Sequence, residues 1–401
     1  MTAVSECAAH CIACGSGALK TVPSAALRCG ITSDVKPWPR CGIFAHCSAC
    51  GHLQKIQDAQ WRADVERIYS EYEMYVLSGG NEQVVFEGGQ PAPRTRRLLE
   101  KVLREVSLPE DGWMLDVGCG NGSLLRTVNS LRPRWQLAGF DVHDRFRAAV
   151  ENVPGVREFY SGSVEQVGRA FDLISLTYVI EHLFEPLAVV RQLRQKLKPG
   201  GKLLIHTSNY LENPFDLAVV DHCSHFSPRT LAALVECAGF EVVAHGDDWI
   251  PKEIGVVARG AGCPACEPAG ATSAPHRLTA CATGNESYAS AAGRLAWLAQ
   301  VLEQARAGLA SGAFYIFGTA IAGSWLASML GPGVCGFVDE DPQRLGKQHL
   351  GLPVINPAGV PAGATVYLAF APHLARKLQQ RLQGQYPAVA YVVTPGWEEE
   401  A

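Results

Sequence analysis

A glycine-rich turn between apolar segments constrains the fold of this chain more than any other feature. The apolar run Trp113–Val117 leads into the turn Gly118–Gly122, and the amphipathic segment Ser123–Leu131 follows. We interpret this order as a strand, a tight turn and a helix, in which glycine lets backbone approach a ligand and the helix start offers unpaired N–H groups. The next apolar run ends at Asp141, whose carboxylate can accept both hydroxyls of a ribose. The turn and the acid together predict a site for a cofactor that contains a nucleoside.

The segments beyond Asp141 predict a doubly wound α/β domain. The apolar spacing predicts a buried strand over Phe171–Thr177, a helix over Pro186–Leu197 and, after a Pro-Gly-Gly stop, a strand over Lys202–His206. Two last strands are expected at Phe240–Val243 and Ile254–Ala258. The Asp-x-Gly-x-Gly-x-Gly form of the turn and this order of elements resemble the core of class I S-adenosylmethionine-dependent methyltransferases over about 150 residues.

That resemblance implies S-adenosylmethionine as the cofactor and assigns particular residues to it. One position departs from the family pattern, because a serine follows the third strand where many such enzymes have an aspartate near adenine. The residues implied are Asp116, Gly118 and Gly120 around the methionine portion, Asp141 at the ribose, Ser163 near adenine and Tyr178 on the methionine side.

Two copies of a Cys-x-x-Cys-Gly pattern near the N-terminus predict a metal site. Each copy brings two thiolates together in a tight turn, and two such turns complete a tetrahedral site. Residues 1–60 also lack the apolar volume for a core, so a bound metal would help them fold. The alternative is a loop of reduced cysteines. We expect structural Zn²⁺ on Cys11, Cys14, Cys47 and Cys50, with Cys7, Cys29, Cys41, His10, His46 and His52 as substitute ligands.

The C-terminal part of the chain predicts a second Rossmann-like unit. A helix is expected over Ala289–Leu309, followed by strands over Ala313–Phe317 and Val334–Val338 with a glycine-containing turn, residues 318–323, between them. Ala320 stands where dinucleotide-binding turns have their middle glycine, which lets backbone approach a pyrophosphate. We therefore expect a domain that frames the substrate site rather than one that binds a dinucleotide.

These patterns give an α/β fold class with four parts along the chain. They are a small zinc-binding domain at 1–60, a methyltransferase domain with a helical lead-in at 61–260, a linker or insertion at 261–284 and a C-terminal Rossmann-like α/β domain at 285–401. The linker is rich in Ala, Gly and Pro. Its isolated Cys263-x-x-Cys266 is only a weak indication of a redox or metal role.

Composition restricts the partners. The chain has 401 residues, a net charge of −4 and no long basic stretch, which argues against a nucleic-acid partner. The N-terminal residues do not resemble a signal peptide, and no segment approaches the apolar length that a membrane span needs. With a cofactor made inside cells, the fourteen cysteines are expected to be reduced or metal-bound. We expect a cytoplasmic protein that acts on a small molecule, with no membrane partner.

The order of these domains resembles the sugar C-methyltransferases that act on nucleotide-linked 4-keto-deoxysugars. Family members typically have Glu-His-x-x-Tyr-Phe in one segment, where this chain has Asp221 for the glutamate and His225 for the tyrosine. The first change keeps the charge with a shorter reach, and the second removes a phenol. The parts that carry the resemblance are the two Cys-x-x-Cys-Gly patterns, Asp116–Gly122, Asp221–Phe226 and Gly318–Asp341.

The resemblance implies methylation of carbon through an enolate. A carbon atom becomes nucleophilic once a proton alpha to a ketone is removed, and a histidine with a pKa near neutrality can remove it. By resemblance His222 is this base and Asp221 supports it, since a carboxylate can orient an imidazole and stabilise its cation. Tyr75 or Tyr72 is expected to contact the enolate oxygen. His225 is expected to be a second acid–base group or a substrate contact.

Other readings of the sequence stay open. His182 follows the strand beside the cofactor and is expected to be structural, and His222 itself could be a structural histidine in a polar loop. An O- or N-methyltransferase of a sugar or natural-product intermediate would use the same Asp-His pair on a hydroxyl or amine. A ribosomal-RNA methyltransferase is less favoured by the acidic balance and the extra C-terminal domain. A scaffold without activity is disfavoured by the intact Asp116 and Asp141.

Overall fold

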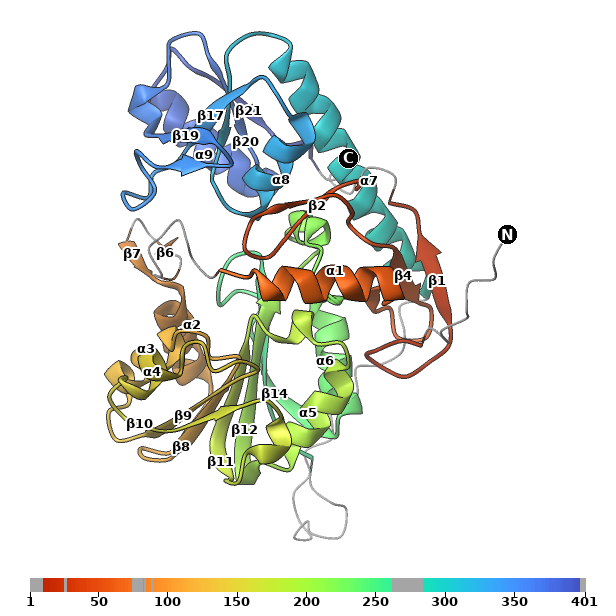
Figure 1. The fold of residues 1–401 in the computed structure, drawn as a ribbon, viewed down its shortest axis with the longest axis vertical. Helices are drawn as coiled ribbons and strands as arrows, with labels where there is room; N and C mark the ends of the chain where they lie inside the picture. The colour runs from red at the N-terminus through yellow and green to blue at the C-terminus, as the bar shows by residue number, and fades with distance from the viewer. Residues whose placement is uncertain are drawn as a thin grey trace.

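Three larger sheets organise the part of the chain that the computed structural model describes, namely residues 10–24, 27–73, 82, 84–87, 90–261 and 284–396. Figure 1 shows the seven-stranded sheet at the bottom and the six-stranded sheet at the top. The N-terminal strands of the four-stranded sheet, red in the figure, lie at one side against helix α7 (Gly284–Leu309), and α1 (Ala59–Ser70) crosses the middle. Most of the expected linker, including its two cysteines Cys263 and Cys266, lies outside the described residues. Tyr75 lies outside them as well.

The seven-stranded sheet has the order β10-β9-β8-β11-β12-β15-β14. All pairs from β10 to β12 are parallel, and β15 is antiparallel to both of its neighbours. The chain reverses its direction of winding between β8 and β11, so ligands are expected at the carboxyl ends of these two strands. The strands are β8 (Trp113–Val117), β9 (Gln136–Asp141), β10 (Val156–Ser161), β11 (Phe171–Thr177), β12 (Leu197–Ser208), β14 (Phe240–His245) and β15 (Glu253–Gly260).

Helices cover both faces of this sheet, because its central strands are apolar on both sides. Met114 belongs to the core under α2 and α3, while its neighbour Leu115 belongs to the core under α5 and α6. Ser227 caps α6 through a capping box with Thr230, as the Ser-Pro start predicts. The helices are α2 (Arg94–Glu105), α3 (Ser123–Leu131), α4 (Arg147–Glu151), α5 (Pro186–Arg194) and α6 (Pro228–Cys237), with the hairpin β6 (Val84–Glu87) and β7 (Gln90–Pro93) before them.

Two boundaries differ from the sequence expectation. Helix α5 ends at Arg194, and β12 already begins at Leu197, so the predicted Pro-Gly-Gly stop lies inside the strand. The pairing of β11 with β12 is irregular between Phe171 and Leu173, which accommodates this segment in the sheet. The helical lead-in to the methyltransferase domain, α1, likewise ends at Ser70. Tyr72, which was predicted to contact the enolate oxygen, therefore lies beyond the helix.

The N-terminal sheet takes its last strand from far along the chain. Its order is β1-β4-β5-β13, and β13 (Ser224–His225) pairs antiparallel with β5 (Leu53–Lys55). A two-residue strand in a loop has no periodicity, so the sequence does not predict it. The other elements here are β1 (Leu19–Val22), β4 (Phe44–Cys47) and the hairpin β2 (Gly30–Ile31) and β3 (Pro37–Trp38).

The C-terminal sheet is parallel except at one edge and has the order β18-β19-β17-β16-β20-β21. This is the half-Rossmann arrangement that the sequence predicts. Its elements are β16 (Phe314–Phe317), β17 (Val334–Val338), β18 (Gln348–His349), β19 (Leu352–Ile355), β20 (Thr365–Leu368), β21 (Ala390–Val393), α8 (Ile321–Leu330) and α9 (Pro372–Gln385).

One apolar core joins the N-terminal residues to the C-terminal unit. It combines Ile31 and Phe44 with Phe215 of the 3-10 helix η4 (Pro214–Ala218), and with side chains of α7 and α8. The N-terminal segment therefore shares a core with other parts of the chain, in line with its low apolar content. Among the helices of the described residues, none combines the length and apolar composition that crossing a membrane requires.

Candidate active site and metal centre

The glycine turn lies at the carboxyl end of β8, where the sequence places it. Gly118, Gly120 and Gly122 all have positive φ angles, of 71°, 48° and 82°. A Cβ on Gly118 would lie 2.3 Å from a methyl carbon of Val179, so this position has no room for a side chain. Oδ2 of Asp141, at the end of β9, accepts a hydrogen bond of 3.1 Å from the Gly120 amide. The predicted ribose acid and the predicted turn are thus in direct contact.

Asp116 lies buried below this turn. Its Oδ1 accepts a hydrogen bond of 2.7 Å from the Ser175 hydroxyl on β11. Burial, reinforced by the nearby charge of Asp141, raises the pKa of Asp116 to about 7, and the Ser175 hydrogen bond opposes this rise. With a pKa of about 7, the Asp116 carboxyl group can either donate a hydrogen bond to a polar ligand above it or accept one from that ligand.

Tyr178 follows β11 and has an uncommon backbone conformation, with φ of 57°. Its ring is covered by the Arg94 guanidinium at 4.3 Å and meets the edge of the His206 ring at 5.6 Å. The Tyr178 hydroxyl is buried beside the Glu253 carboxylate. The predicted place of Tyr178 on the methionine side stays a prediction.

Ser163 and Tyr72 have local contacts. The Ser163 hydroxyl accepts a hydrogen bond from the Glu165 amide at 3.3 Å, which caps a short turn after β10. The Tyr72 ring lies 6.0 Å from that of Tyr69, and the Tyr72 carbonyl accepts a hydrogen bond from Arg145. The predicted contacts of Ser163 with adenine and of Tyr72 with an enolate stay predictions, as does the role of Tyr75.

His222 pairs with a carboxylate that the sequence did not indicate. Its Nδ1 lies 3.0 Å from Oδ1 of Asp216, a residue of η4, and Asp221 is not its closest acid. The second oxygen of Asp216 accepts a hydrogen bond of 2.7 Å from Nδ1 of His225. Asp216 thus lies between the two histidines, all three side chains are buried, and Nε2 is the His222 nitrogen left for a substrate.

The charges in this group differ sharply from those of free side chains. Burial alone would lower the pKa of His222, but the charge and hydrogen bond of Asp216, together with the charges of Glu181 and Asp221, outweigh burial and raise it to about 9. Burial would raise the pKa of Asp216, but the charge of His222 and hydrogen bonds from both histidines hold it well below its usual range. Burial lowers the pKa of His225 to about 4. At neutral pH the group is an ion pair of His222 and Asp216 beside a neutral His225.

Asp221 has a different set of partners from the predicted one. Its Oδ1 accepts a hydrogen bond of 2.8 Å from the Ser33 amide, and its Oδ2 accepts one of 2.5 Å from the Ser33 hydroxyl. The same Oδ2 lies 3.6 Å from Nδ1 of His182. Asp221 and His222 lie in the irregular segment before β13, so their adjacency in the sequence does not make them hydrogen-bond partners. Asp221 is held by Ser33 and lies near His182, and its charge still contributes to the raised pKa of His222.

His182 is part of the cluster, although the sequence suggested a structural role for it. It ends the 3-10 helix η3 (Ile180–His182), directly after β11. Its Nδ1 lies 2.9 Å from the Tyr69 hydroxyl of α1, and its ring centroid is 4.7 Å from that of His222. The Glu-His pair directly after a predicted strand was the one signal that could have indicated this position. Tyr69 and Asp216 had no such signal.

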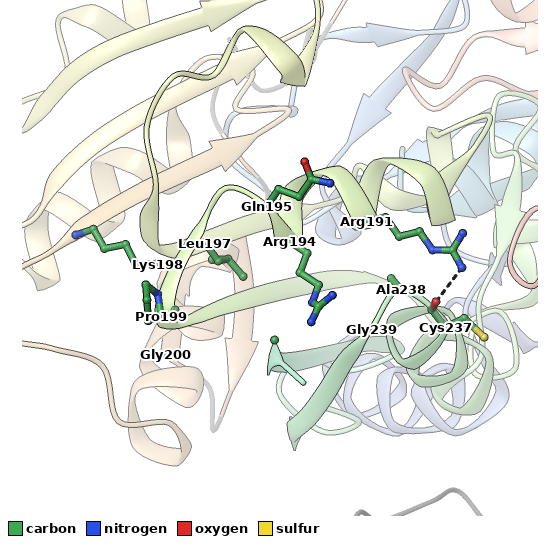
Figure 2. Close-up of a pocket in the computed structure, with 12 residues that line it drawn as sticks. Arg191, Arg194, Gln195, Leu197, Lys198, Pro199, Gly200, Cys237, Ala238 and Gly239 are labelled. Carbon is green, nitrogen blue, oxygen red and sulfur yellow. Dashed lines mark hydrogen bonds between the residues drawn. The ribbon is translucent and has the colours of Figure 1, made fainter. Parts of the chain in front are cut away.

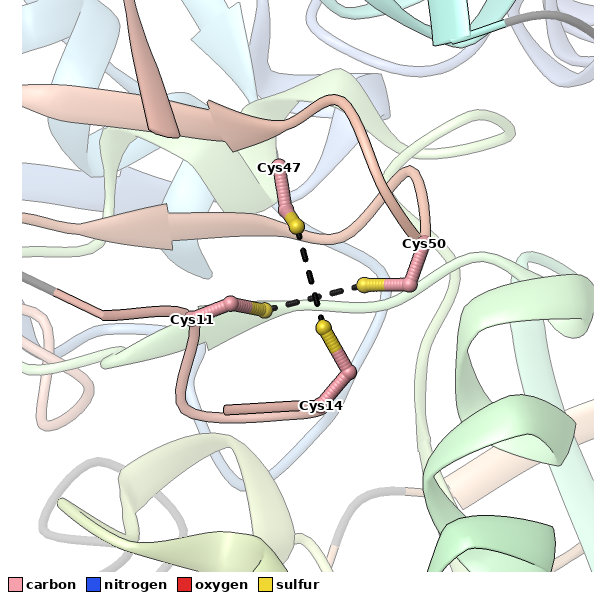
Figure 3. A group of neighbouring side chains, drawn as sticks. All are labelled: Cys11, Cys14, Cys47 and Cys50. Atoms are coloured by element: carbon pink, nitrogen blue, oxygen red, sulfur yellow. Dashed lines mark hydrogen bonds between the residues drawn. The ribbon is translucent and has the colours of Figure 1, made fainter. Parts of the chain in front are cut away.

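The four predicted metal ligands converge on one point. Sγ of Cys11 lies 3.6 Å from that of Cys50, and Sγ of Cys14 lies 3.8 Å from that of Cys47. Figure 3 shows these two lines crossing between the four sulfurs. Four sulfurs at about 2.3 Å from a tetrahedral Zn²⁺ would be about 3.8 Å apart, so the donor set fits zinc. Of the substitute ligands, His46 bonds to Ser287 instead and His52 to Ser224.

A separate pocket of about 770 Å³ lies at the opposite edge of the seven-stranded sheet. The end of α5 and the start of β12 line it, and Figure 2 shows Arg191 reaching the carbonyl of Cys237. Its cationic side chains are Arg191, Arg194 and Lys198, and no acid or histidine lines it. Ligands of doubly wound sheets bind at the carboxyl ends of the strands, so this pocket is not the candidate active site.

Comparison with known proteins agrees with the geometry. Residues 92–245 match the sequence model of a family described as a methyltransferase domain. A ubiquinone biosynthesis O-methyltransferase of Xanthomonas campestris pv. campestris (strain B100) is 32% identical over 131 residues, which cover 30% of this chain and 53% of that protein. The corresponding enzyme of Cereibacter sphaeroides is 29% identical over 179 residues, covering 37% of this chain and 69% of that protein.

The chain spans about half the length of the first of these relatives. Among solved structures, an S-adenosylmethionine-dependent methyltransferase from Clostridium acetobutylicum aligns with 51% of this chain and 98% of its own, at 12% identity and a TM-score of 0.36. That similarity is too low to bear on substrate or mechanism. The matched family and the strand order agree, and residues 92–245 are a methyltransferase domain with the class I, S-adenosylmethionine-dependent fold.

Proposed function

We propose that this protein transfers the methyl group of S-adenosylmethionine to a ring carbon of a nucleotide-linked keto-deoxysugar. The observation that carries the proposal is the buried Asp216–His222 pair at the same sheet edge as the glycine turn. Val179, against Gly118, is only three residues before His182, so the turn and the cluster adjoin. The larger resemblance of the chain to sugar C-methyltransferases supports the choice of acceptor.

The residues of the turn fit the cofactor. Backbone approach at Gly118 and Gly120 leaves space for the methionine portion, and the half-buried Asp141 presents a carboxylate to the ribose. S-Adenosylmethionine supplies a methyl group on a positively charged sulfur, which a nucleophile attacks in line. The sulfonium is already reactive, so the protein contributes chiefly by positioning the acceptor.

The histidine cluster prepares the acceptor. Nε2 of His222, once neutral, takes the proton from the carbon alpha to the ketone, and Asp216 stabilises the imidazolium that results. A base whose pKa is about 9 suits a weakly acidic C–H bond better than an ordinary histidine would. The His182 ring lies 4.7 Å from that of His222, and the Tyr69 hydroxyl bonds to His182 at 2.9 Å, so we infer that His182, held by Tyr69, donates a hydrogen bond to the enolate oxygen.

A second candidate is O-methylation of a hydroxyl group. The curated relatives that match the methyltransferase domain are described as O-methyltransferases, and the Asp216–His222 pair could deprotonate a hydroxyl equally well. The two candidates differ in the atom that receives the methyl group.

We further propose that Cys11, Cys14, Cys47 and Cys50 hold one structural Zn²⁺. The four sulfurs leave no ligand position open, which is typical of structural sites. Elemental analysis of the purified chain should find one zinc per molecule, and Cys14→Ser should lower this content. Full zinc content in Cys14→Ser would contradict the assignment.

The proposed activity is tested on the product. The protein is incubated with S-adenosylmethionine carrying a carbon-13 methyl group and a panel of nucleotide-linked keto-deoxysugars. Mass spectrometry should show the gain of one methyl group, and carbon-13 NMR should place it on a ring carbon. A methyl group on oxygen would replace this proposal with the second candidate, and no transfer in the presence of demonstrable cofactor binding would contradict the choice of acceptor.

A further inference from the structure

The four-cysteine centre is connected through β5 to β13, the strand that begins two residues after the candidate base His222. We propose that His52 and Gln54 are positioning residues, which fix the segment 221–226 relative to the cysteine centre and so place His222 for proton transfer. The inference rests on the proposed role of His222. It assigns to the N-terminal segment a part in the active site beyond stabilising its own fold.

A continuous β-ladder connects the two places. Cys47 is the last residue of β4, Cys50 lies in the following turn, and β5 begins at Leu53. Strand β13 then pairs with β5, with Ser224 opposite Gln54 and His225 opposite Leu53. The Lys55 amide adds a hydrogen bond of 2.9 Å to the carbonyl of Cys223. The segment after His222 is thus held by the strand that leaves the second cysteine pair.

His52 joins the second cysteine pair to β13. Its carbonyl accepts a hydrogen bond of 2.9 Å from the amide of Cys47. Its Nε2 lies 3.1 Å from the Ser224 hydroxyl, and both side chains are fully buried. A buried polar bond of this kind has no water to replace it, so its loss leaves a partner unsatisfied. Ser224 lies between His222 and His225, so its position fixes both.

Gln54 joins the first cysteine pair to the same strand. Its Oε1 accepts a hydrogen bond of 2.9 Å from the Ile12 amide, inside the turn between Cys11 and Cys14. Its Nε2 donates to the carbonyl of His10 at 3.2 Å. The backbone of Gln54 meanwhile lies opposite Ser224. His52 therefore connects the second cysteine pair to β13, and Gln54 connects the first. A displacement of the four-cysteine centre would move β13 and with it His222 and His225.

His46 provides a matched contrast within the same sheet. It is also a fully buried histidine next to a cysteine of the centre, and its Nε2 also bonds to a serine, at 2.9 Å. Its partner, Ser287, belongs to α7 and not to β13. A change at His46 should disturb the sheet to a similar degree without touching the segment 221–226.

The test compares His52→Ala, Gln54→Leu and His46→Ala in the full-length protein. Zinc content and circular dichroism establish that each variant is folded, and His52→Gln, whose amide can still reach Ser224, serves as a conservative rescue. Hydrogen exchange at residues 223–226 should become about tenfold faster or more in His52→Ala and Gln54→Leu and stay unchanged in His46→Ala. With an active acceptor, kcat should fall about 10- to 100-fold while KM changes little, because a small misplacement of a base lowers the rate of the chemical step.

The exchange measurement needs no acceptor, so it separates this inference from the proposed function. Faster exchange at 223–226 with normal zinc content supports the inference even if no sugar is methylated. Unchanged exchange in His52→Ala and Gln54→Leu, or an equal change in His46→Ala, would overturn it. If one of His52→Ala and Gln54→Leu does not fold, the other still decides by comparison with His46→Ala.

Discussion

The glycine turn and the histidine cluster lie at the same edge of one sheet, yet they are built in opposite ways. The turn and its acid come from one stretch of chain, residues 116–141, and their contacts are set by β8, β9 and the start of α3. The cluster draws on α1, η3, η4 and the approach to β13, with Ser33 reaching Asp221 from the N-terminal segment. The residues of the cofactor site thus lie close together in the sequence. Those of the histidine cluster come from distant segments that only the complete fold brings together.

The two regions also shift the pKa of a buried acid in opposite directions. Asp116 has no cationic partner, and burial raises its pKa to about 7. Asp216 lies between two histidines, and the His222 charge holds its pKa well below the usual range. The turn therefore has little fixed charge of its own below the ligand, while the cluster holds an ion pair at neutral pH, from which His222 must lose its proton before it can act as a base. Changes in the two regions should accordingly separate binding of the cofactor from transfer of the methyl group.

The largest effect is expected from His222→Asn. Removing the base should lower the rate of methyl transfer about 1,000-fold, because general-base catalysis contributes about 100- to 10,000-fold. The affinity for S-adenosylmethionine, measured by titration calorimetry, should stay within about twofold, since His222 belongs to the cluster and not to the turn. His46→Asn is the matched control and should retain transfer. Loss of S-adenosylmethionine binding in His222→Asn would contradict the claim that the cluster and the turn act separately.

Above about pH 8 the pH dependence should report the cluster, because the pKa of Asp116 at the cofactor site is about 7. His222 must be neutral to accept a proton and its pKa is about 9, so kcat/KM should rise about tenfold per pH unit up to about pH 9. The contribution of the His222 titration to stability has the opposite trend. Because the folded pKa exceeds the unfolded value of about 6.5, this contribution is complete below that pH and is lost as pH rises through about 9.

Asp216→Asn sharpens the same test. Without the carboxylate, the inflection in kcat/KM should move to lower pH, because only the smaller effects of Glu181 and Asp221 then oppose burial of His222. Cofactor affinity should show no such inflection. An inflection at the same pH in Asp216→Asn and in the wild type would assign the titration to another group.

A smaller effect is expected at the turn. Asp141→Asn should weaken S-adenosylmethionine binding about 10- to 100-fold, as a charged hydrogen bond to a ribose contributes about 1.5–3 kcal/mol. Asp339→Asn, at the equivalent strand end of the C-terminal sheet, is the control. Asp339 already accepts hydrogen bonds from Thr319 and Arg344, so its change should leave cofactor affinity unaltered. Equal losses in both variants would place the nucleoside outside the turn.

The smallest effect is expected from Tyr69→Phe. It removes one hydroxyl beside His182 and keeps the ring that packs near Tyr72. Methyl transfer should fall about threefold to tenfold, because a single hydrogen bond contributes about 1 kcal/mol. Steady-state rates at saturating cofactor measure this. A rate equal to that of the wild type would remove Tyr69 from the cluster's function.

The same contrast explains how much the sequence could predict. The strand, the turn and Asp141 follow from glycine spacing and apolar periodicity, which depend only on neighbouring residues, and the structure confirms them. The C-terminal sheet follows from the same kind of pattern. Asp221 was a reasonable partner for the adjacent His222, but both lie in an irregular segment, where adjacency in the sequence does not decide which side chains meet.

The remaining residues of the cluster carry no local signal. Asp216 lies in a segment without periodicity, Tyr69 is one of several tyrosines near α1, and Ser33 is almost two hundred positions from the carboxylate it binds. The pairing of β13 with β5 brings these segments together, and a two-residue strand leaves no pattern in the sequence. Only tertiary packing determines which acid meets which histidine.

The most direct measurement follows the acceptor's carbon-bound hydrogen in the absence of methyl transfer. The protein is incubated in D₂O with a nucleotide-linked keto-deoxysugar and S-adenosylhomocysteine, which has no methyl group to give, and proton NMR follows the position alpha to the ketone. We predict exchange of that hydrogen by the wild type and by Asp141→Asn at saturating ligand, and none by His222→Asn. No exchange by the wild type, or equal exchange by His222→Asn, would contradict the claim that the cluster activates carbon beside a separate cofactor site.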